Sequence, residues 1–71
     1  MIYLQKGDVC VHIDSHFKVI WNGNATFNVF DTKNNEVDVF TVNGVQNSSD
    51  ALWHAKHYID NLYKEIGGQY A

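Results

Sequence analysis

The sequence lacks arginine and proline, has a single cysteine and contains no long apolar run. Because Cys10 has no second cysteine to pair with, a domain held together by internal disulfides is excluded. All five basic residues are lysines and the net charge is −3, so the arginines that read guanine and pair with phosphate are missing. This balance argues against nucleic acid as the partner.

No apolar stretch reaches the roughly 18 residues that a membrane span needs. The first eight residues, MIYLQKGD, lack a basic segment followed by an apolar core, so no secretion signal is expected. With 71 residues, of which 45% are hydrophobic and 18% charged, residues 1–71 are expected to fold as one domain. These features predict a cytoplasmic protein that does not enter a membrane.

Short runs of β-branched and aromatic residues alternate at period two in the first two thirds of the chain, which is typical of strands. Asn22-Gly23 and Asn43-Gly44 mark turns, because both residue types accept positive φ. Four strands are expected, at Val9–Ile13, Phe17–Trp21, Thr26–Phe30 and Val37–Val42. Ile2–Leu4 is a candidate for a fifth strand at an edge.

After the second turn the apolar residues step by three and four, which predicts a helix from about Ser49 to Ile66. Its apolar stripe consists of Leu52, Ala55, Ile59, Leu62 and Ile66, flanked by Tyr58 and Tyr63. Ser48 or Ser49 is expected to cap its start, and Gly67-Gly68 to end it. The predicted fold is α+β: an antiparallel sheet of four or five strands followed by one C-terminal packing helix.

The alternation assigns one face of the sheet to the helix and leaves the other uncovered. The expected helix side carries Val9, Val11, Ile13, Phe17, Val19, Trp21, Phe27, Val29, Val37 and Val39. The expected outer side carries Cys10, His12, Lys18, Ile20, Asn28, Phe30, Asp38, Phe40 and Val42. Its apolar members Ile20, Phe30, Phe40 and Val42 predict a self-association face and a homodimer. Two alternatives are a different register, or an N-terminal segment folded across this face.

A tryptophan stands on the polar side of the predicted helix. Trp53 lies about 140° from the centre of the apolar stripe and shares its side with His57, Asp60 and Lys64. Such a tryptophan is either covered by a loop or serves as a binding anchor. These four residues are the predicted partner-binding site.

Four potential zinc ligands occur in two pairs, Cys10 with His12 and His54 with His57. In the expected register the strand pair faces away from the helix that carries the other pair, so no metal site and no cofactor are predicted. Cys10 and His12 could also be drawn as a thiol–imidazole pair, but neighbours on a strand meet without any chemistry. No catalytic residues and no enzymatic activity are expected.

The segment Ser49–Asp60, SDALWHAKHYID, resembles a helix found in small phage and mobile-element proteins. There a short sheet precedes a helix of the pattern acidic-x-Leu-x-x-Ala-Lys-x-Tyr/Ala-Ile-Asp, and Trp53 replaces the acidic residue usual at its position. The resemblance implies the same sheet-plus-helix architecture and no catalytic residues. It also implies a phage or mobile-element origin, where small acidic proteins often bind host proteins, anti-CRISPR inhibitors among them.

These observations predict a non-enzymatic protein-interaction module, with a phage-encoded inhibitor of a host protein as its most specific form. One alternative is a sheet that binds single-stranded nucleic acid by stacking bases on Phe30 and Phe40. The other is a small zinc-binding domain.

Overall fold

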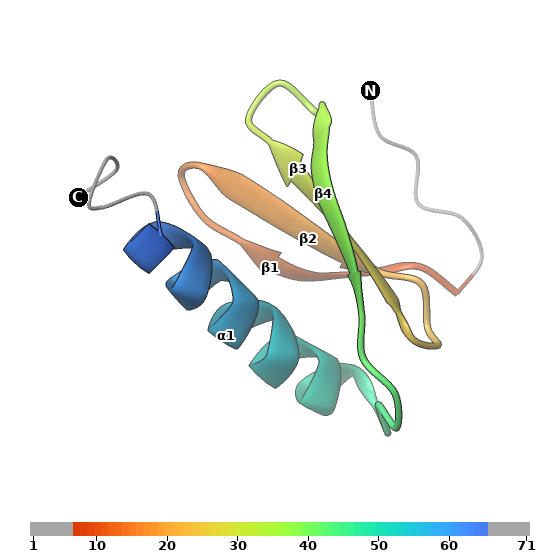
Figure 1. Ribbon diagram of the computed structural model, residues 1–71. Helices are drawn as coiled ribbons and strands as arrows, with labels where there is room; N and C mark the ends of the chain where they lie inside the picture. Colours follow the sequence, from red (N-terminus) through yellow and green to blue (C-terminus); the bar gives the residue numbers. More distant parts are fainter. Residues whose placement is uncertain (1–6, 66–71) are drawn as a thin grey trace.

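The computed structural model describes residues 7–65 as a four-stranded antiparallel sheet followed by one helix (Figure 1). The elements are β1 (Val9–Ile13), β2 (Phe17–Trp21), β3 (Thr26–Asp31), β4 (Glu36–Thr41) and α1 (Ser48–Glu65). The strands lie in the order β1-β2-β3-β4, so each one pairs with the next along the chain. The predicted α+β fold is confirmed. The candidate strand Ile2–Leu4 and the expected helix end at Ile66 lie outside the described residues.

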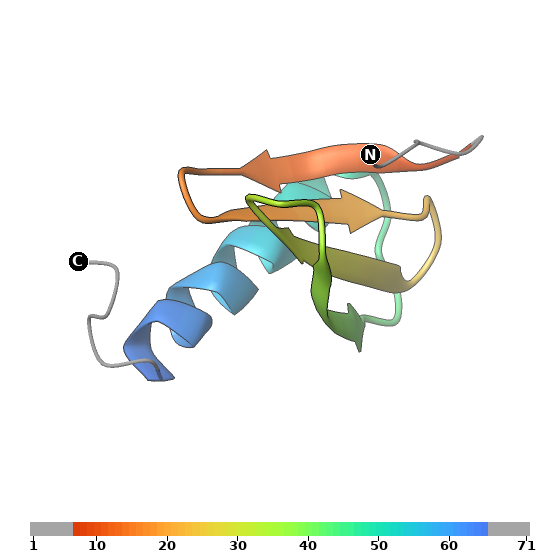
Figure 2. The same cartoon turned by 90° about the horizontal axis from the view of Figure 1, so that it is seen from above.

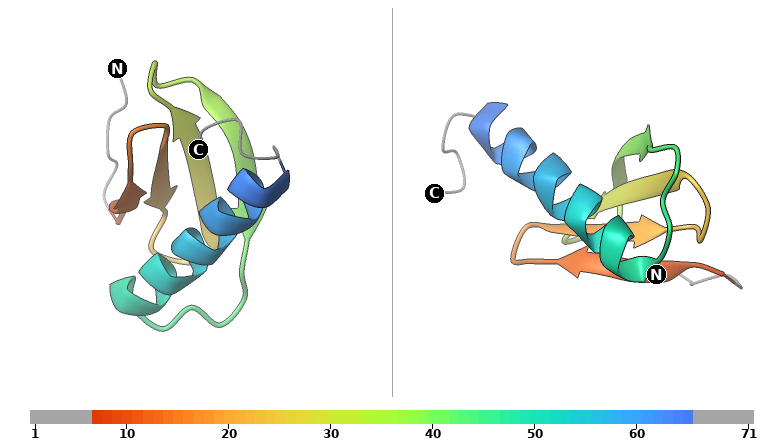
Figure 3. Two further views of the ribbon diagram at one scale, coloured as in Figure 1. Left: turned by 90° about the vertical axis from the view of Figure 1, so that its left-hand side faces the viewer. Right: turned by 90° about the horizontal axis from the view of Figure 1, so that it is seen from below.

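The helix covers one face of the sheet and crosses the strands at an angle (Figures 2 and 3). It contacts mainly β1 and β2. The core consists of Val11, Phe17, Val19, Trp21, Phe27 and Val29 from the sheet and Ala51, Ala55 and Ile59 from the helix. The two alanines allow the helix to lie close to the strands. For the six sheet residues the predicted face is confirmed.

A bulge in β1 reverses the faces of the residues that follow it. Cys10 lies opposite Ile20, but His12 lies opposite Val19, so Val11 is the extra residue. His12 therefore shares the helix side with buried Val19, whereas Ile13 is 67% exposed. The prediction that His12 faces away from the helix and Ile13 toward it was wrong, because one inserted residue inverts a period-two pattern.

The faces of β4 are also reversed relative to the prediction. Phe40 lies directly opposite buried Phe27, and its ring stacks between those of Phe27 and Tyr58, at centroid distances of 4.7 and 4.1 Å. Val42 also packs against the core, whereas Val37 and Val39 are 49% and 50% exposed. Both sets of alternate residues in β4 contain apolar side chains, and the set with the larger ring to bury faces the helix.

The β2–β3 turn is built around Asn22, whose Oδ1 accepts the backbone N–H groups of Asn24 and Thr26 at 2.8 and 3.2 Å. Gly23 has φ of 84°, and a Cβ at this position would lie 2.7 Å from the carbonyl oxygen of Gly7. Only glycine fits there without a shift of the backbone. The same turn holds Trp21, whose Nε1–H donates to the carbonyl of Asn24 at 2.8 Å.

The helix is capped by Asn47 rather than by the expected serines. Asn47 Oδ1 accepts the backbone N–H of Asp50 at 2.9 Å, and Asn47 O accepts the N–H of Ala51 at 3.0 Å. In return, the Asp50 carboxylate accepts the N–H of Gln46 at 3.1 Å. The Asn47 side chain thereby satisfies one of the N–H groups that the first helical turn leaves unpaired.

Candidate functional site

The side of α1 that points away from the sheet carries four exposed side chains. These residues, called the α1 ridge below, are Trp53, His57, Asp60 and Lys64. At 100° per residue the ridge lies about 170° from the line of Ala51, Ala55 and Ile59, which is buried. In Figures 1 and 3 all four strands lie on one side of α1. The structure therefore places the four predicted partner-binding residues together on one surface.

Trp53 is exposed and is held by its helical neighbours. Trp53 is 56% exposed, and its ring centroid lies 3.9 Å from that of His57. The ring of His54 meets it edge-on at 5.0 Å, and His54 Nε2 lies 3.5 Å from Asp50 Oδ1. This exposure disagrees with the alternative in which a loop covers Trp53.

The two charged members of the ridge do not pair with each other. Asp60 and Lys64 stand at i and i+4, a spacing that allows an ion pair. Within residues 7–65 no ion pair joins them. Both charged side chains are exposed.

The predicted self-association face does not form as expected. Phe40 and Val42 pack on the helix side, and Ile20 is only 5% exposed. Of the four residues, Phe30 alone is on the outer face with part of its surface accessible. The cause is the reversed β4, which exchanges Phe40 for Val39 on that face.

The four potential zinc ligands do not converge. Cys10 is exposed and its Sγ contacts the carbonyl oxygen of His12 at 3.7 Å, while the bulge turns the His12 ring to the other face. His54 and His57 surround Trp53 on the far side of α1. Across the part of the chain that is described, no three His, Cys, Asp or Glu side chains lie close enough to hold a metal ion.

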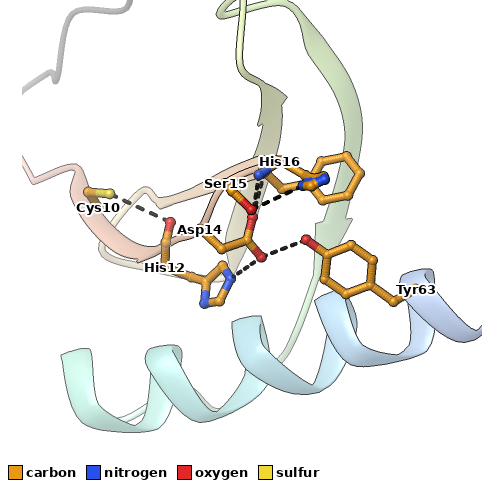
Figure 4. Close-up of polar contacts among 7 residues, drawn as sticks. Cys10, His12, Asp14, Ser15, His16 and Tyr63 are labelled. Atoms are coloured by element: carbon orange, nitrogen blue, oxygen red, sulfur yellow. Dashed lines mark hydrogen bonds and ion pairs between the residues drawn. The ribbon is translucent and has the colours of Figure 1, made fainter. Parts of the chain in front are cut away.

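Figure 4 shows a polar cluster that sequence reasoning missed, centred on Asp14 in the β1–β2 turn. Asp14 Oδ1 accepts the backbone N–H groups of His16 and Phe17 at 2.8 and 2.7 Å. Asp14 Oδ2 accepts the O–H of Tyr63 at 2.8 Å and lies 3.2 Å from His12 Nε2. One carboxylate thus joins β1, the following turn and the last turn of α1.

The environment of Asp14 keeps the side chain ionised. Partial burial raises the pKa of this carboxyl, but the hydrogen bonds from His16, Phe17, Tyr63 and His12 outweigh burial and lower it from 3.8 to about 2. Both oxygens already accept two contacts each, so the carboxylate is poorly placed to act as a base. Its arrangement fits a structural anchor. Sequence gave no signal for it, since Tyr63 is 49 positions away.

Two shallow hollows lie beside this cluster, between the β1–β2 and β3–β4 turns. The smaller, of about 220 Å³, is lined by Ile13, Asp14, Phe17, Lys18, Asp31, Thr32 and Asn34. The larger, of about 400 Å³, is lined by Ser15, His16, Phe17, Asp31, Thr32 and Lys33. Carboxylates and lysines are mixed in both linings, so neither hollow selects a ligand of one charge.

No protein family, curated protein or solved structure matches the chain. The resemblance of the C-terminal helix to phage and mobile-element proteins therefore stays a prediction. Among residues 7–65, no helix combines the length and the apolar character needed to cross a membrane.

Proposed function

We propose that this protein is a non-enzymatic protein-interaction module and that the α1 ridge is its binding surface. The observation that carries the proposal is the exposed Trp53 indole, which lies against His57 at 3.9 Å and points away from the core. Tryptophan is enriched among residues that dominate binding energy at protein interfaces.

The local geometry suits a binding anchor. Because Trp53 already lies against His57 and His54, little side-chain entropy remains to be lost when a partner covers it. Asp60 and Lys64 follow on the same side and supply charges of both signs that orient a partner. The helix itself is fixed to the sheet by Ala51, Ala55 and Ile59, so the ridge is presented on a rigid element.

The two alternative functions lose their structural basis. Base stacking on the sheet needs Phe30 and Phe40 on one exposed face, but Phe40 is stacked against Tyr58 on the helix side. A zinc-binding domain needs Cys10, His12, His54 and His57 to converge, and they lie on different surfaces.

The resemblance of the helix to phage and mobile-element proteins extends the proposal to a partner class. On that basis the module binds a protein of the host cytoplasm and acts as an inhibitor by occupying its surface, as anti-CRISPR proteins do.

Quantitative affinity capture tests the proposal. Tagged wild-type protein, Trp53→Ala and Ile13→Ala are compared in host extract, because Ile13 is equally accessible but lies on the sheet, away from the ridge. We expect a protein that is captured by wild type and by Ile13→Ala and is reduced at least about 10-fold with Trp53→Ala. Equal capture by all three variants would refute the ridge as the binding surface. Purified single-stranded DNA, titrated in about 150 mM salt, should bind no tighter than millimolar.

A further inference from the structure

The spacing of the side chains along the α1 ridge is symmetric about its centre. The four residues stand at successive spacings of four, three and four, so the ridge reads with the same spacing from either end. A two-fold axis through the midpoint between positions 58 and 59 relates position 53 to 64 and position 57 to 60. An antiparallel pair of such helices would therefore place Trp53 opposite Lys64 and His57 opposite Asp60.

These cross-pairs are chemically complementary. A lysine ammonium over a tryptophan face is an attractive cation–π contact. An imidazole and a carboxylate form a hydrogen bond whether the ring is neutral or protonated. Each contact occurs twice across the axis, so all eight ridge side chains in the two copies find a partner. The absence of an ion pair between Asp60 and Lys64 within residues 7–65 leaves both groups available for it.

The opposite arrangement is disfavoured by the same residues. In a parallel pair of helices each ridge residue would face its own copy, which sets Asp60 against Asp60 and Lys64 against Lys64. Like charges across an interface are repulsive, and parallel helix dipoles add to that repulsion. The antiparallel pair avoids both.

The shape of the molecule permits this approach. The sheet lies on one side of α1 only (Figures 2 and 3). The ridge is about 170° around the helix from the buried residues that face the sheet. A spacing of four and three is also the one at which helices pack side by side with a crossing angle near 20°. The 18 residues of α1 span about 27 Å, which gives three to four contact layers.

We infer that the α1 ridge binds a second copy of this chain, forming a two-fold antiparallel helix–helix dimer with paired Trp53–Lys64 and His57–Asp60 contacts. The inference rests on the proposed function in one respect, the ridge as a protein-binding surface, and specifies the partner. One helix from each copy makes a small interface, so the dimer is weak, with a Kd on the order of 10 µM.

Sedimentation equilibrium of the purified chain from about 2 to 500 µM tests the inference, with circular dichroism as the check that every variant is folded. We expect a monomer–dimer equilibrium for wild type and at least about a 30-fold higher Kd for Trp53→Ala. Ile13→Asp, on the exposed sheet face, should leave the Kd within about 3-fold of wild type.

Substitutions that change the charge at His57 test the antiparallel geometry. His57→Asp alone sets two carboxylates opposite each other and should raise the Kd at least about 10-fold. His57→Lys sets an ammonium opposite the Asp60 carboxylate in the antiparallel dimer and should keep the Kd within about 3-fold of wild type. In a parallel dimer His57→Lys would instead set two ammonium groups opposite each other and raise the Kd at least about 10-fold.

Three results would overturn the inference: a monomer at 500 µM, a dimer that Ile13→Asp dissociates, or a Kd for His57→Lys that rises as much as that of His57→Asp. The capture experiment keeps this separate from the proposed function. A monomeric chain that still captures a host protein through Trp53 refutes the second copy as partner and leaves the ridge as the binding surface. A monomeric chain that captures no protein through Trp53 refutes both the second copy as partner and the ridge as the binding surface.

Discussion

The Asp14 carboxylate accepts hydrogen bonds from groups that are far apart in the sequence, and its ionised form is the one that these bonds stabilise. Its folded-state pKa is about 2, below the ordinary 3.8. A group whose pKa is lowered by folding stabilises the fold fully at pH values above its unfolded pKa. That contribution disappears as the pH falls from about 4 toward 2. Allowing for partial exposure of the side chain, it amounts to about 1–2 kcal/mol.

Replacing Asp14 should remove this pH dependence. We expect Asp14→Asn to lower the free energy of unfolding by about 1–2 kcal/mol at pH 7, because the amide keeps one acceptor oxygen but loses the charge. Urea denaturation at pH 7, 4 and 2 measures the difference from wild type, which should shrink to near zero at pH 2. Asp38→Asn, at an exposed β4 position, serves as the control and should show no such convergence. A difference that stays constant with pH would contradict the explanation.

The two faces of β4 differ in a way that adjacent substitutions can measure. Phe40 stacks between Phe27 and Tyr58, whereas Val39 is 50% exposed. We expect Phe40→Ala to lower the free energy of unfolding by about 2–4 kcal/mol and Val39→Ala by less than about 0.5 kcal/mol. Chemical denaturation of both variants tests this, and the reverse order of the two losses would support the prediction from sequence that Val39, not Phe40, faces the helix. For the same reason, Phe40→Asp should unfold the domain rather than dissociate a dimer.

The strands and the helix were predictable because their signals are local. The predicted limits of the first two strands, Val9–Ile13 and Phe17–Trp21, are those of the structure, and the helix differs by one residue at its start. The faces were less predictable. The bulge after Cys10 inverts a period-two pattern, and no glycine or proline marks it. In β4 both sets of alternate residues contain apolar side chains, so the pattern alone did not decide which set faces the helix.

In the candidate site, too, the residues placed by a local pattern were predictable and those placed by the tertiary fold were not. The α1 ridge was predictable because four positions on one helix are placed by the helical period alone. The Asp14 cluster was not, since it joins a turn to a residue 49 positions away through the fold. The predicted self-association face of Ile20, Phe30, Phe40 and Val42 did not form as expected. Its prediction depended on which side of β4 faces the helix.

Among residues 7–65 the outer strands of the sheet are β1 and β4, and both carry features that discourage pairing with another sheet. The bulge at Val11 interrupts the ladder of β1. Along β4 the exposed acidic side chains of Glu36 and Asp38 alternate with Val37 and Val39. Bulges and charges at edges are known protections against edge-to-edge aggregation.

Removing the charges of β4 should allow that edge to pair with the sheet of another molecule. We expect Glu36→Val combined with Asp38→Val to form thioflavin-positive aggregates at least about 10 times faster than wild type at 37 °C, because the strand becomes uniformly apolar. Asp60→Asn combined with Glu65→Gln removes the same net charge from the helix and should leave the rate within about 2-fold of wild type. Equal acceleration by both pairs would attribute the effect to net charge instead of the edge.

The contrast between the two tryptophans makes the chain its own optical reporter. Trp21 is 7% exposed and hydrogen-bonded within its turn, so its emission is blue-shifted and shielded from a dissolved quencher such as iodide. Trp53 emits from the surface at longer wavelength and in contact with an imidazole ring. Loss of the short-wavelength component therefore follows unfolding, while protection of the long-wavelength component follows occupation of the helix. A single cuvette distinguishes a variant that has lost its fold from one that has lost only its partner.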